Sequence, residues 1–128
     1  MKRCFLILFA LMLVSCYNIE RDCTDFKTGT FEFKYTIDGI EKIGQFERTK
    51  LWNIDYYEGK VDSSSVRWIN DCEFILKKIN PINNAEKDAI HMKILSTSDN
   101  SYTFEYKLAV KKSNRPLLVE KGLAVKIN

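Results

Sequence analysis

Hydrophobic and polar residues alternate with a period of two along most of this chain. The clearest run follows Gly29, where one face carries apolar and aromatic residues and the other carries polar ones (Phe31, Phe33, Tyr35 and Ile37 against Glu32, Lys34, Thr36 and Asp38). Such alternation is typical of a β-strand with one buried face. Asp38-Gly39 is a strong hairpin signal, so we expect a tight turn and a second strand over residues 40–48.

The same pattern recurs to the end of the chain. We expect further strands over residues 51–58, 65–78, 89–96, 102–110 and 118–127, with turns at 59–64, at 98–101 and near 112–116. The longest run places Val66, Trp68, Asn70, Cys72, Phe74 and Leu76 on one face. Pro81 ends this run, and residues 84–88 fit a short capped helical turn.

Seven strands joined by short connections predict an all-β fold, an antiparallel up-and-down meander. A flat sheet of this width would leave two unpaired edges. We therefore expect the meander to curl into a small lipocalin-like barrel, complete or incomplete. A two-sheet sandwich is the alternative, because alternation alone does not distinguish the two architectures.

The first sixteen residues have a different pattern, which predicts export. A short basic start precedes Cys4 to Val14, an uncharged apolar run of eleven residues. This run is shorter than the ~20 residues of a membrane span and is typical of a secretory signal. Leu13-Val14-Ser15-Cys16 resembles the bacterial lipobox. The resemblance implies a signal peptide over 1–15, cleavage between Ser15 and Cys16, and a lipid on the Cys16 sulfur. The alternative is an ordinary signal peptide that contains a cysteine.

This interpretation divides the chain into the signal peptide 1–15, the lipidated cysteine with a tether over 16–27, and a single β domain over 28–128. Lys2 and Arg3 leave with the signal, so the 20 basic side chains fall to 18 against 17 acidic ones, a net charge of +1. A nearly neutral mature chain gives no reason to expect a nucleic-acid partner. We expect a protein of the cell envelope whose first partner is the membrane, through the N-terminal lipid.

Cys23 and Cys72 are the cysteines that remain once the signal is removed and Cys16 is acylated. An even pair in an exported, oxidising compartment favours a disulfide between them. The alternative is two buried free thiols. Two cysteines and the single histidine, His91, have no local ligand spacing and make a poor zinc motif, so we expect neither a metal nor another cofactor.

Three motifs resemble a group of small lipoproteins from Bacteroidetes, among them flavobacteria. They are Thr28-Gly29-Thr30-Phe31, the mid-chain Glu47-Arg48, and Trp68-Ile69-Asn70-Asp71-Cys72-Glu73-Phe74, against the patterns T-G-x-F and W-x-N-x-C-E-[FY]. The resemblance implies an outer-membrane location, in either leaflet, and no particular activity. A DNA topoisomerase IV label on relatives would find no support here, because this chain has no glycine-rich phosphate-binding loop.

We single out Trp68, Arg48 and Glu73 for contact with a ligand or partner. Aromatic residues such as Trp68 line pockets for apolar ligands, although they more often fill the core of a small β domain. Arg48 and Glu73 would recognise a polar group as a buried ion pair, and an ordinary cross-strand surface pair is the simpler alternative. His91 alternates with Ile90 and Met92, so we expect it on a solvated face.

No set of residues predicts catalysis. Ser63-Ser64-Ser65 is expected in a turn and lacks a G-x-S-x-G context, and no facing carboxylates can be nominated for a hydrolase. We therefore expect a non-enzymatic, membrane-anchored module that binds an envelope protein or another ligand of unknown identity. The alternatives are a lipocalin-like carrier of a small apolar ligand and an envelope hydrolase. An internal cavity would favour carriage, whereas a filled core with an exposed aromatic patch would favour protein interaction.

Overall fold

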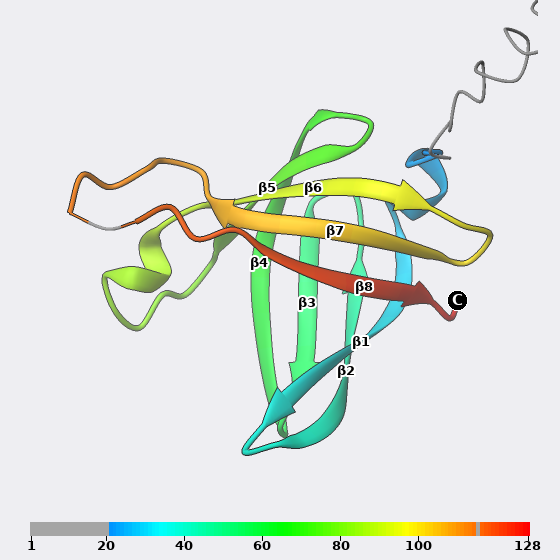
Figure 1. Cartoon of the computed structure of the whole chain (residues 1–128), viewed down its shortest axis with the longest axis horizontal. Helices are drawn as coiled ribbons and strands as arrows, with labels where there is room; N and C mark the ends of the chain where they lie inside the picture. The colour runs from blue at the N-terminus through cyan, green and yellow to red at the C-terminus, as the bar shows by residue number, and fades with distance from the viewer. Residues whose placement is uncertain (1–20, 115) are drawn as a thin grey trace, which may run out of the picture.

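Eight antiparallel strands follow one another in chain order and close into a barrel, in which β1 pairs with both β2 and β8 (Figure 1). The computed structural model describes residues 21–114 and 116–128. The strands are β1 (Gly29–Ile37), β2 (Ile40–Arg48), β3 (Trp52–Tyr57), β4 (Lys60–Asn70), β5 (Glu73–Lys78), β6 (Ile90–Thr97), β7 (Ser101–Leu108) and β8 (Glu120–Lys126). The predicted all-β meander and its closure into a small lipocalin-like barrel are confirmed, and the sandwich is excluded.

The predicted signal peptide, its cleavage after Ser15 and the lipid-bearing Cys16 lie outside the described residues. The remaining chain forms one continuous ring of strands with two short 3-10 turns, η2 (Thr24–Phe26) and η3 (Ala85–Lys87). The turn η3 is the helical turn that the sequence predicts near residues 84–88. The N-cap residue Asn84 makes no side-chain hydrogen bond to this turn, and the side chain of Asn83 before it accepts one from the Glu86 backbone instead.

The eighth strand comes from the segment 65–78, which the sequence analysis treats as one strand. A two-residue turn at Asp71-Cys72 divides it, and Trp68 of β4 then lies opposite Phe74 of β5. The register shifts by one residue between Trp68 and Asn70, so even-numbered residues lie on the inner face of both strands. The alternation therefore continues through the turn and does not reveal it. The turn predicted at 59–64 is also wrong, because it is limited to Glu58-Gly59 and the serines 63–65 lie within β4.

The turn η2 closes one end of the barrel. Cys23 and Phe26 are almost fully buried and join the inward side chains of the strands in one core cluster, which contains Phe31, Phe46, Ile94, Tyr102 and Ala124. The sequence analysis assigns residues 23–27 to a tether because they show no periodicity. They belong instead to the packed domain, since a single 3-10 turn buries one aromatic ring without needing a periodic pattern.

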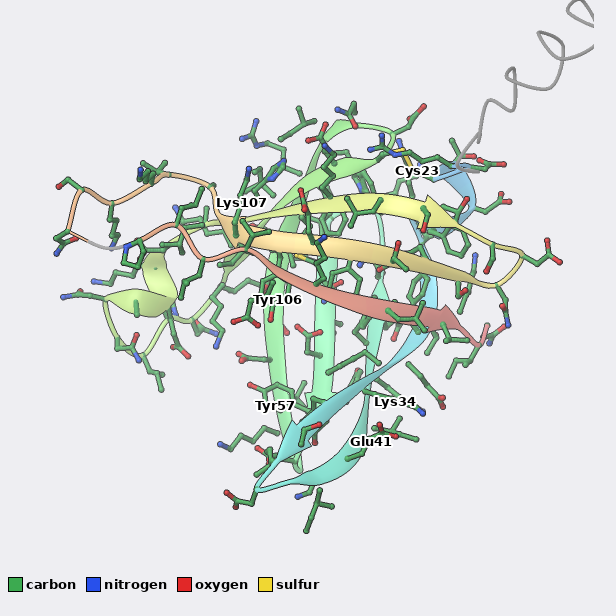
Figure 2. All side chains as sticks on the ribbon, in the orientation of Figure 1. Cys23, Lys34, Glu41, Tyr57, Tyr106 and Lys107 are labelled. Atoms are coloured by element: carbon green, nitrogen blue, oxygen red, sulfur yellow. A yellow bond between two sulfur atoms is a disulfide. The ribbon has the colours of Figure 1, made fainter. Side chains whose placement is uncertain are left out.

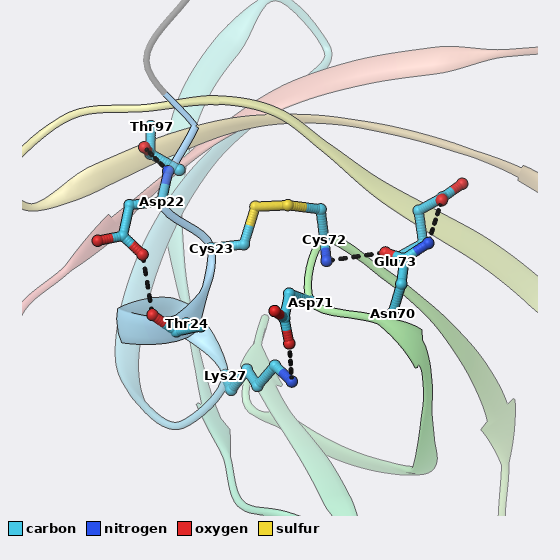
Figure 3. Close-up of a disulfide and its surroundings, with 9 residues drawn as sticks. All are labelled: Asp22, Cys23, Thr24, Lys27, Asn70, Asp71, Cys72, Glu73 and Thr97. Carbon is cyan, nitrogen blue, oxygen red and sulfur yellow. Dashed lines mark hydrogen bonds and ion pairs between the residues drawn. A yellow bond between two sulfur atoms is a disulfide. The ribbon is translucent and has the colours of Figure 1, made fainter.

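A disulfide between Cys23 and Cys72 fixes this closed end, as predicted (Figure 3). The two Cα atoms are 5.2 Å apart and the bond joins positions separated by 49 residues. Two polar contacts flank it in Figure 3: the Asp22 backbone N–H donates to Thr97 Oγ1 at 2.8 Å, and Lys27 pairs with Asp71 at 2.8 Å. The segment before β1 is therefore attached both to the β4–β5 turn and to β6.

The first and last strands of the barrel pair over only part of their length. β1 and β8 pair only from Phe31 to Phe33 and from Ala124 to Lys126. The rest of β1, up to Ile37, and the start of β8, from Glu120, have no partner in the other strand. In Figure 1 the β1–β2 hairpin descends away from β8, which leaves a lateral seam towards the end opposite η2.

The disulfide should contribute strongly to stability. A crosslink over 49 positions is expected to stabilise by about 4 kcal/mol in the loop-entropy model. We expect the double variant Cys23→Ala, Cys72→Ala to unfold at lower denaturant concentration and lower temperature than the unreduced wild type. Thiol labelling after denaturation without reductant should leave both cysteines unmodified, and labelling of both would contradict the bond.

Candidate ligand-binding cavity

A cavity of about 400 Å³ lies inside the barrel towards the seam. Its wall is mainly aromatic and aliphatic, with side chains from β1, β5, β6 and β7 (Phe33, Tyr35, Leu76, Met92, Phe104 and Tyr106). Lys34, Lys121 and Leu123, from the two strands that border the seam, also line it. This volume lies within the range of small-molecule sites, and the aromatic wall suits an apolar ligand.

Two glycines leave room for the cavity. Gly44 of β2 lies opposite Phe33, and Gly122 of β8 lies opposite Phe104. A Cβ atom at either glycine would fall within 3 Å of the facing phenylalanine ring. Each ring therefore lies against the bare backbone of the neighbouring strand. Larger residues at positions 44 and 122 would push these rings into the lumen.

Arg48 forms the polar end of the cavity, next to η2. The side chain is only 3 % exposed, and each of its nitrogens donates to a protein oxygen. Nε donates to Asn53 Oδ1 at 3.1 Å, Nη1 to the Phe26 carbonyl at 3.1 Å, and Nη2 to the Tyr102 hydroxyl at 3.0 Å. One arginine thus connects β2 with β3, with β7 and with the turn that closes the barrel.

The guanidinium group of Arg48 is surrounded by aromatic rings. Its central carbon lies 4.4 Å from the ring centre of Phe74, 5.0 Å from Phe46, 5.3 Å from Phe31 and 5.9 Å from Tyr102. No carboxylate of the described residues lies within 4.0 Å of it. Cation–π attraction and hydrogen bonds to neutral oxygens therefore replace a direct ion pair.

Asn53 connects Arg48 to Asp55. While its Oδ1 accepts from Arg48, its Nδ2 donates to Asp55 Oδ1 at 3.0 Å. Asp55 is half-buried, points inward from β3 and lines the cavity. Burial raises the pKa of Asp55 to about 6, against the opposing effects of the Asn53 hydrogen bond and the Arg48 charge. At neutral pH this carboxyl is mostly ionised, and mild acid protonates it.

A second polar cluster fixes the loop between β5 and β6. Lys78 lies 2.7 Å from Asp62 and 2.6 Å from Glu86, and these two hydrogen-bonded carboxylates hold the pKa of Lys78 above its usual value. The Tyr57 hydroxyl donates to Asp62 at 3.4 Å. Figure 2 shows Tyr57, Lys34 and Glu41 at the end of the barrel opposite Cys23. The loop that carries η3 is therefore bound to β4 and β5.

The structure separates the three residues that the sequence analysis singles out. Arg48 lines the cavity, whereas Trp68 and Glu73 are not among its lining residues. Trp68 packs on Phe74 with ring centres 4.5 Å apart, and the Lys27 ammonium lies 5.0 Å from its ring. The expected pair of Arg48 with Glu73 is wrong in both of its forms, because they belong to strands β2 and β5, which are not neighbours.

Glu73 instead accepts a hydrogen bond from Asn70 at 2.6 Å and lies 3.2 Å from His91 Nε2. The Asn70 hydrogen bond, assisted by the charges of His91 and Lys93, lowers the pKa of Glu73. His91 is not the freely solvated side chain that the sequence predicts, since its Nδ1 is buried and finds no hydrogen-bond partner in the described part of the chain. Neither residue reaches the cavity.

Sequence reasoning missed Asn53 and Asp55. The alternation in β3 draws attention to Trp52, Ile54 and Tyr56, yet Trp52 and Tyr56 are 46 % and 43 % exposed and the strand turns its polar face inward. A signal for this inversion lies in the Glu58-Gly59 hairpin, which pairs Asp55 with Asp62 and Asn53 with Ser64. Polar residues that lie opposite polar residues on two strands joined by a tight turn indicate that this shared polar face points into the barrel.

Comparisons with protein-family models, with curated proteins and with solved structures gave no match. Neither 3-10 turn nor any other element in the described ranges has the length and apolar character of a membrane-crossing helix. Over the same ranges, no three His, Cys, Asp or Glu side chains are grouped to hold a metal ion. The case for function therefore depends on the geometry of the cavity.

Asp55→Asn should stabilise the protein at neutral pH. The folded-state pKa of about 6 exceeds the usual 3.8, so the folded chain binds a proton at Asp55 more tightly than the unfolded chain does. Ionisation of Asp55 therefore lowers the free energy of unfolding as pH rises from about 4 to 6. The asparagine variant avoids that loss and should gain up to about 3 kcal/mol at pH 7.5, reduced by solvent access, and almost nothing at pH 4.

Denaturant melts at both pH values measure this difference. Asp99→Asn, in the exposed turn between β6 and β7, is the matched control and should change little at either pH. Destabilisation by Asp55→Asn at pH 7.5, or an equal effect at both pH values, would show that burial does not raise the pKa of this carboxyl.

Proposed function

We propose that this chain is a non-enzymatic, lipid-anchored envelope protein whose barrel binds a small, largely apolar ligand. The observation that carries the proposal is the cavity of about 400 Å³ with its aromatic wall. A core filled completely by its own side chains would have favoured a protein-interaction module. Glycines at positions 44 and 122 keep two phenylalanine rings against the wall, which supports a cavity that exists before the ligand arrives.

The chemistry of the cavity favours binding over hydrolysis. Asp55 is the only carboxylate among the residues that line it. Glycoside hydrolysis uses a pair of carboxylates at a defined separation. Arg48 and Asn53 are 3 % exposed each, and their hydrogen bonds to protein groups suit a fixed recognition surface.

The anchor belongs to the same proposal. The lipobox-like sequence Leu13-Val14-Ser15-Cys16 supports a lipid on Cys16. The motifs that resemble those of Bacteroidetes lipoproteins support a location at the outer membrane. Cys23 is bonded at the closed end, so residues 17–22 alone separate the lipid from the domain and reach at most ~20 Å. The closed end would then lie near the bilayer, and the cavity would open away from it.

Binding in the cavity can be tested by filling it. Met92 lines the cavity from β6, so Met92→Trp should reduce the affinity for the uncharged fluorescent probe N-phenyl-1-naphthylamine by tenfold or more. Val61→Trp adds the same side chain at an exposed position of β4 and should leave binding unchanged. Titrations that show equal affinities for both variants would exclude the cavity as the binding site.

The anchor is tested by Cys16→Ala. Without the thiol that carries the lipid, the protein should move from the membrane fraction to the soluble fraction of its own cells, because the acyl chains supply the membrane affinity. Immunoblots of the two fractions measure this change. Complete retention of the variant in the membrane fraction would refute lipid anchoring through Cys16.

A further inference from the structure

The polar side chains of the cavity differ in how many of their hydrogen-bonding positions are occupied by other protein groups. Each of the three guanidinium nitrogens of Arg48 already donates to a protein oxygen. The Asn53 amide accepts from Arg48 through its oxygen and donates to Asp55 through its nitrogen. Both side chains are 3 % exposed and serve mainly to order their neighbours.

Asp55 has hydrogen-bond acceptor positions that the protein does not use. Its Oδ1 accepts one hydrogen bond, from Asn53, and within the described part of the chain neither Oδ1 nor Oδ2 makes another. A carboxylate has about four acceptor positions and no donor when ionised. Since Asp55 is half-buried and lines the cavity, its unused acceptor positions are available to a ligand in the lumen.

The neighbouring charges leave Asp55 without a direct cation. From β2, Arg48 acts on it through Asn53, and from β4 and β5, Asp62 and Lys78 act on it with opposite signs. Lys78 is bound directly to Asp62 and Glu86, at 2.7 and 2.6 Å. Among the described residues, no cation lies within 4.0 Å of Asp55. Asp55 thus has no direct positive hydrogen-bond donor, and Lys34 and Lys121, the other cations besides Arg48 that line the cavity, lie on the two strands that border the seam.

We propose that the cavity selects amphiphilic amines, whose apolar body lies against Phe33 and Phe104 and whose ammonium group donates to the Asp55 carboxylate. This inference rests on the proposed function, that the cavity binds a small apolar ligand, and adds the chemistry of its polar end. A fatty acid would bring its carboxylate next to Asp55, where like charges repel. A partly desolvated ion pair in this cavity is stronger than the same pair in water.

Selection by Asp55 makes binding depend on pH. An alkylamine stays cationic up to about pH 10, as lysine does. Asp55 takes up a proton as pH falls through about 6, so the amine loses its partner and its affinity falls. An uncharged ligand of equal length shows the opposite trend, because it covers Asp55 and binds more readily to the protonated form.

Three ligands of equal chain length separate these cases: decylamine, decanol and decanoate, each used to displace N-phenyl-1-naphthylamine from the full lipoprotein in detergent. At pH 7.5 decylamine should bind at least tenfold more tightly than decanol, and decanoate least tightly. At pH 5 the preference for the amine over the alcohol should fall to threefold or less. Asp55→Asn should remove the preference at pH 7.5, and Asp99→Asn, which removes an exposed carboxylate in the turn between β6 and β7, should retain it.

The outcomes distinguish the two proposals. If the probe binds but decylamine and decanol displace it equally, or if decanoate binds best, the cavity remains a binding site and amine selection is wrong. If the preference survives in Asp55→Asn, another group recognises the amine and the assignment of Asp55 is wrong. If neither the probe nor any of the three ligands binds, the proposed function itself fails. The pH comparison on the wild type tests amine selection without any variant, and Asp55→Asn then tests the assignment to Asp55.

Discussion

The burial of Arg48 without a carboxylate beside it is the constraint on which the rest of the structure depends. A buried charge is costly unless polar or polarisable groups surround it, and here four aromatic rings and three oxygens do so. One of those oxygens belongs to Phe26, so the turn that closes the barrel is also a ligand of the guanidinium group. The closed end, the aromatic core and the polar end of the cavity are therefore one unit.

This unit explains why the barrel is filled at one end and hollow at the other. Near η2, the disulfide, Phe26 and the rings around Arg48 pack tightly. Further along the barrel, Gly44 and Gly122 have no side chains where the lumen widens. Asn53 connects Arg48 to Asp55 there by one hydrogen bond to each. A barrel of about one hundred residues must use most inward side chains for its core, so a cavity needs such local omissions.

Alternation is sufficient to predict the antiparallel all-β meander, because strands with one buried face repeat along the chain, and the cost of two unpaired edges favours its closure into a barrel. It fails at Asp71-Cys72, where the register shift between Trp68 and Asn70 keeps even-numbered residues inside on both sides of the turn, and at Phe26, which one short turn buries. Of the site, sequence reasoning identifies Arg48 but assigns it the wrong partner. It does not identify Asn53 and Asp55, because their strand exposes aromatic residues and turns its polar face inward. Which face turns inward is decided by the strand register around the whole barrel, which alternation within one strand does not show.

The lateral seam between β1 and β8 has a consequence for solubility. It presents two strand edges whose backbone groups lack a partner across the seam, and such edges recruit strands from other molecules into mixed sheets. Lys34 and Lys121 lie on these two edges, one on each side. An incoming strand would have to bring its backbone between two ammonium groups, which disfavours edge-to-edge aggregation. The side of the barrel towards which the cavity lies is thereby protected against extended polypeptide.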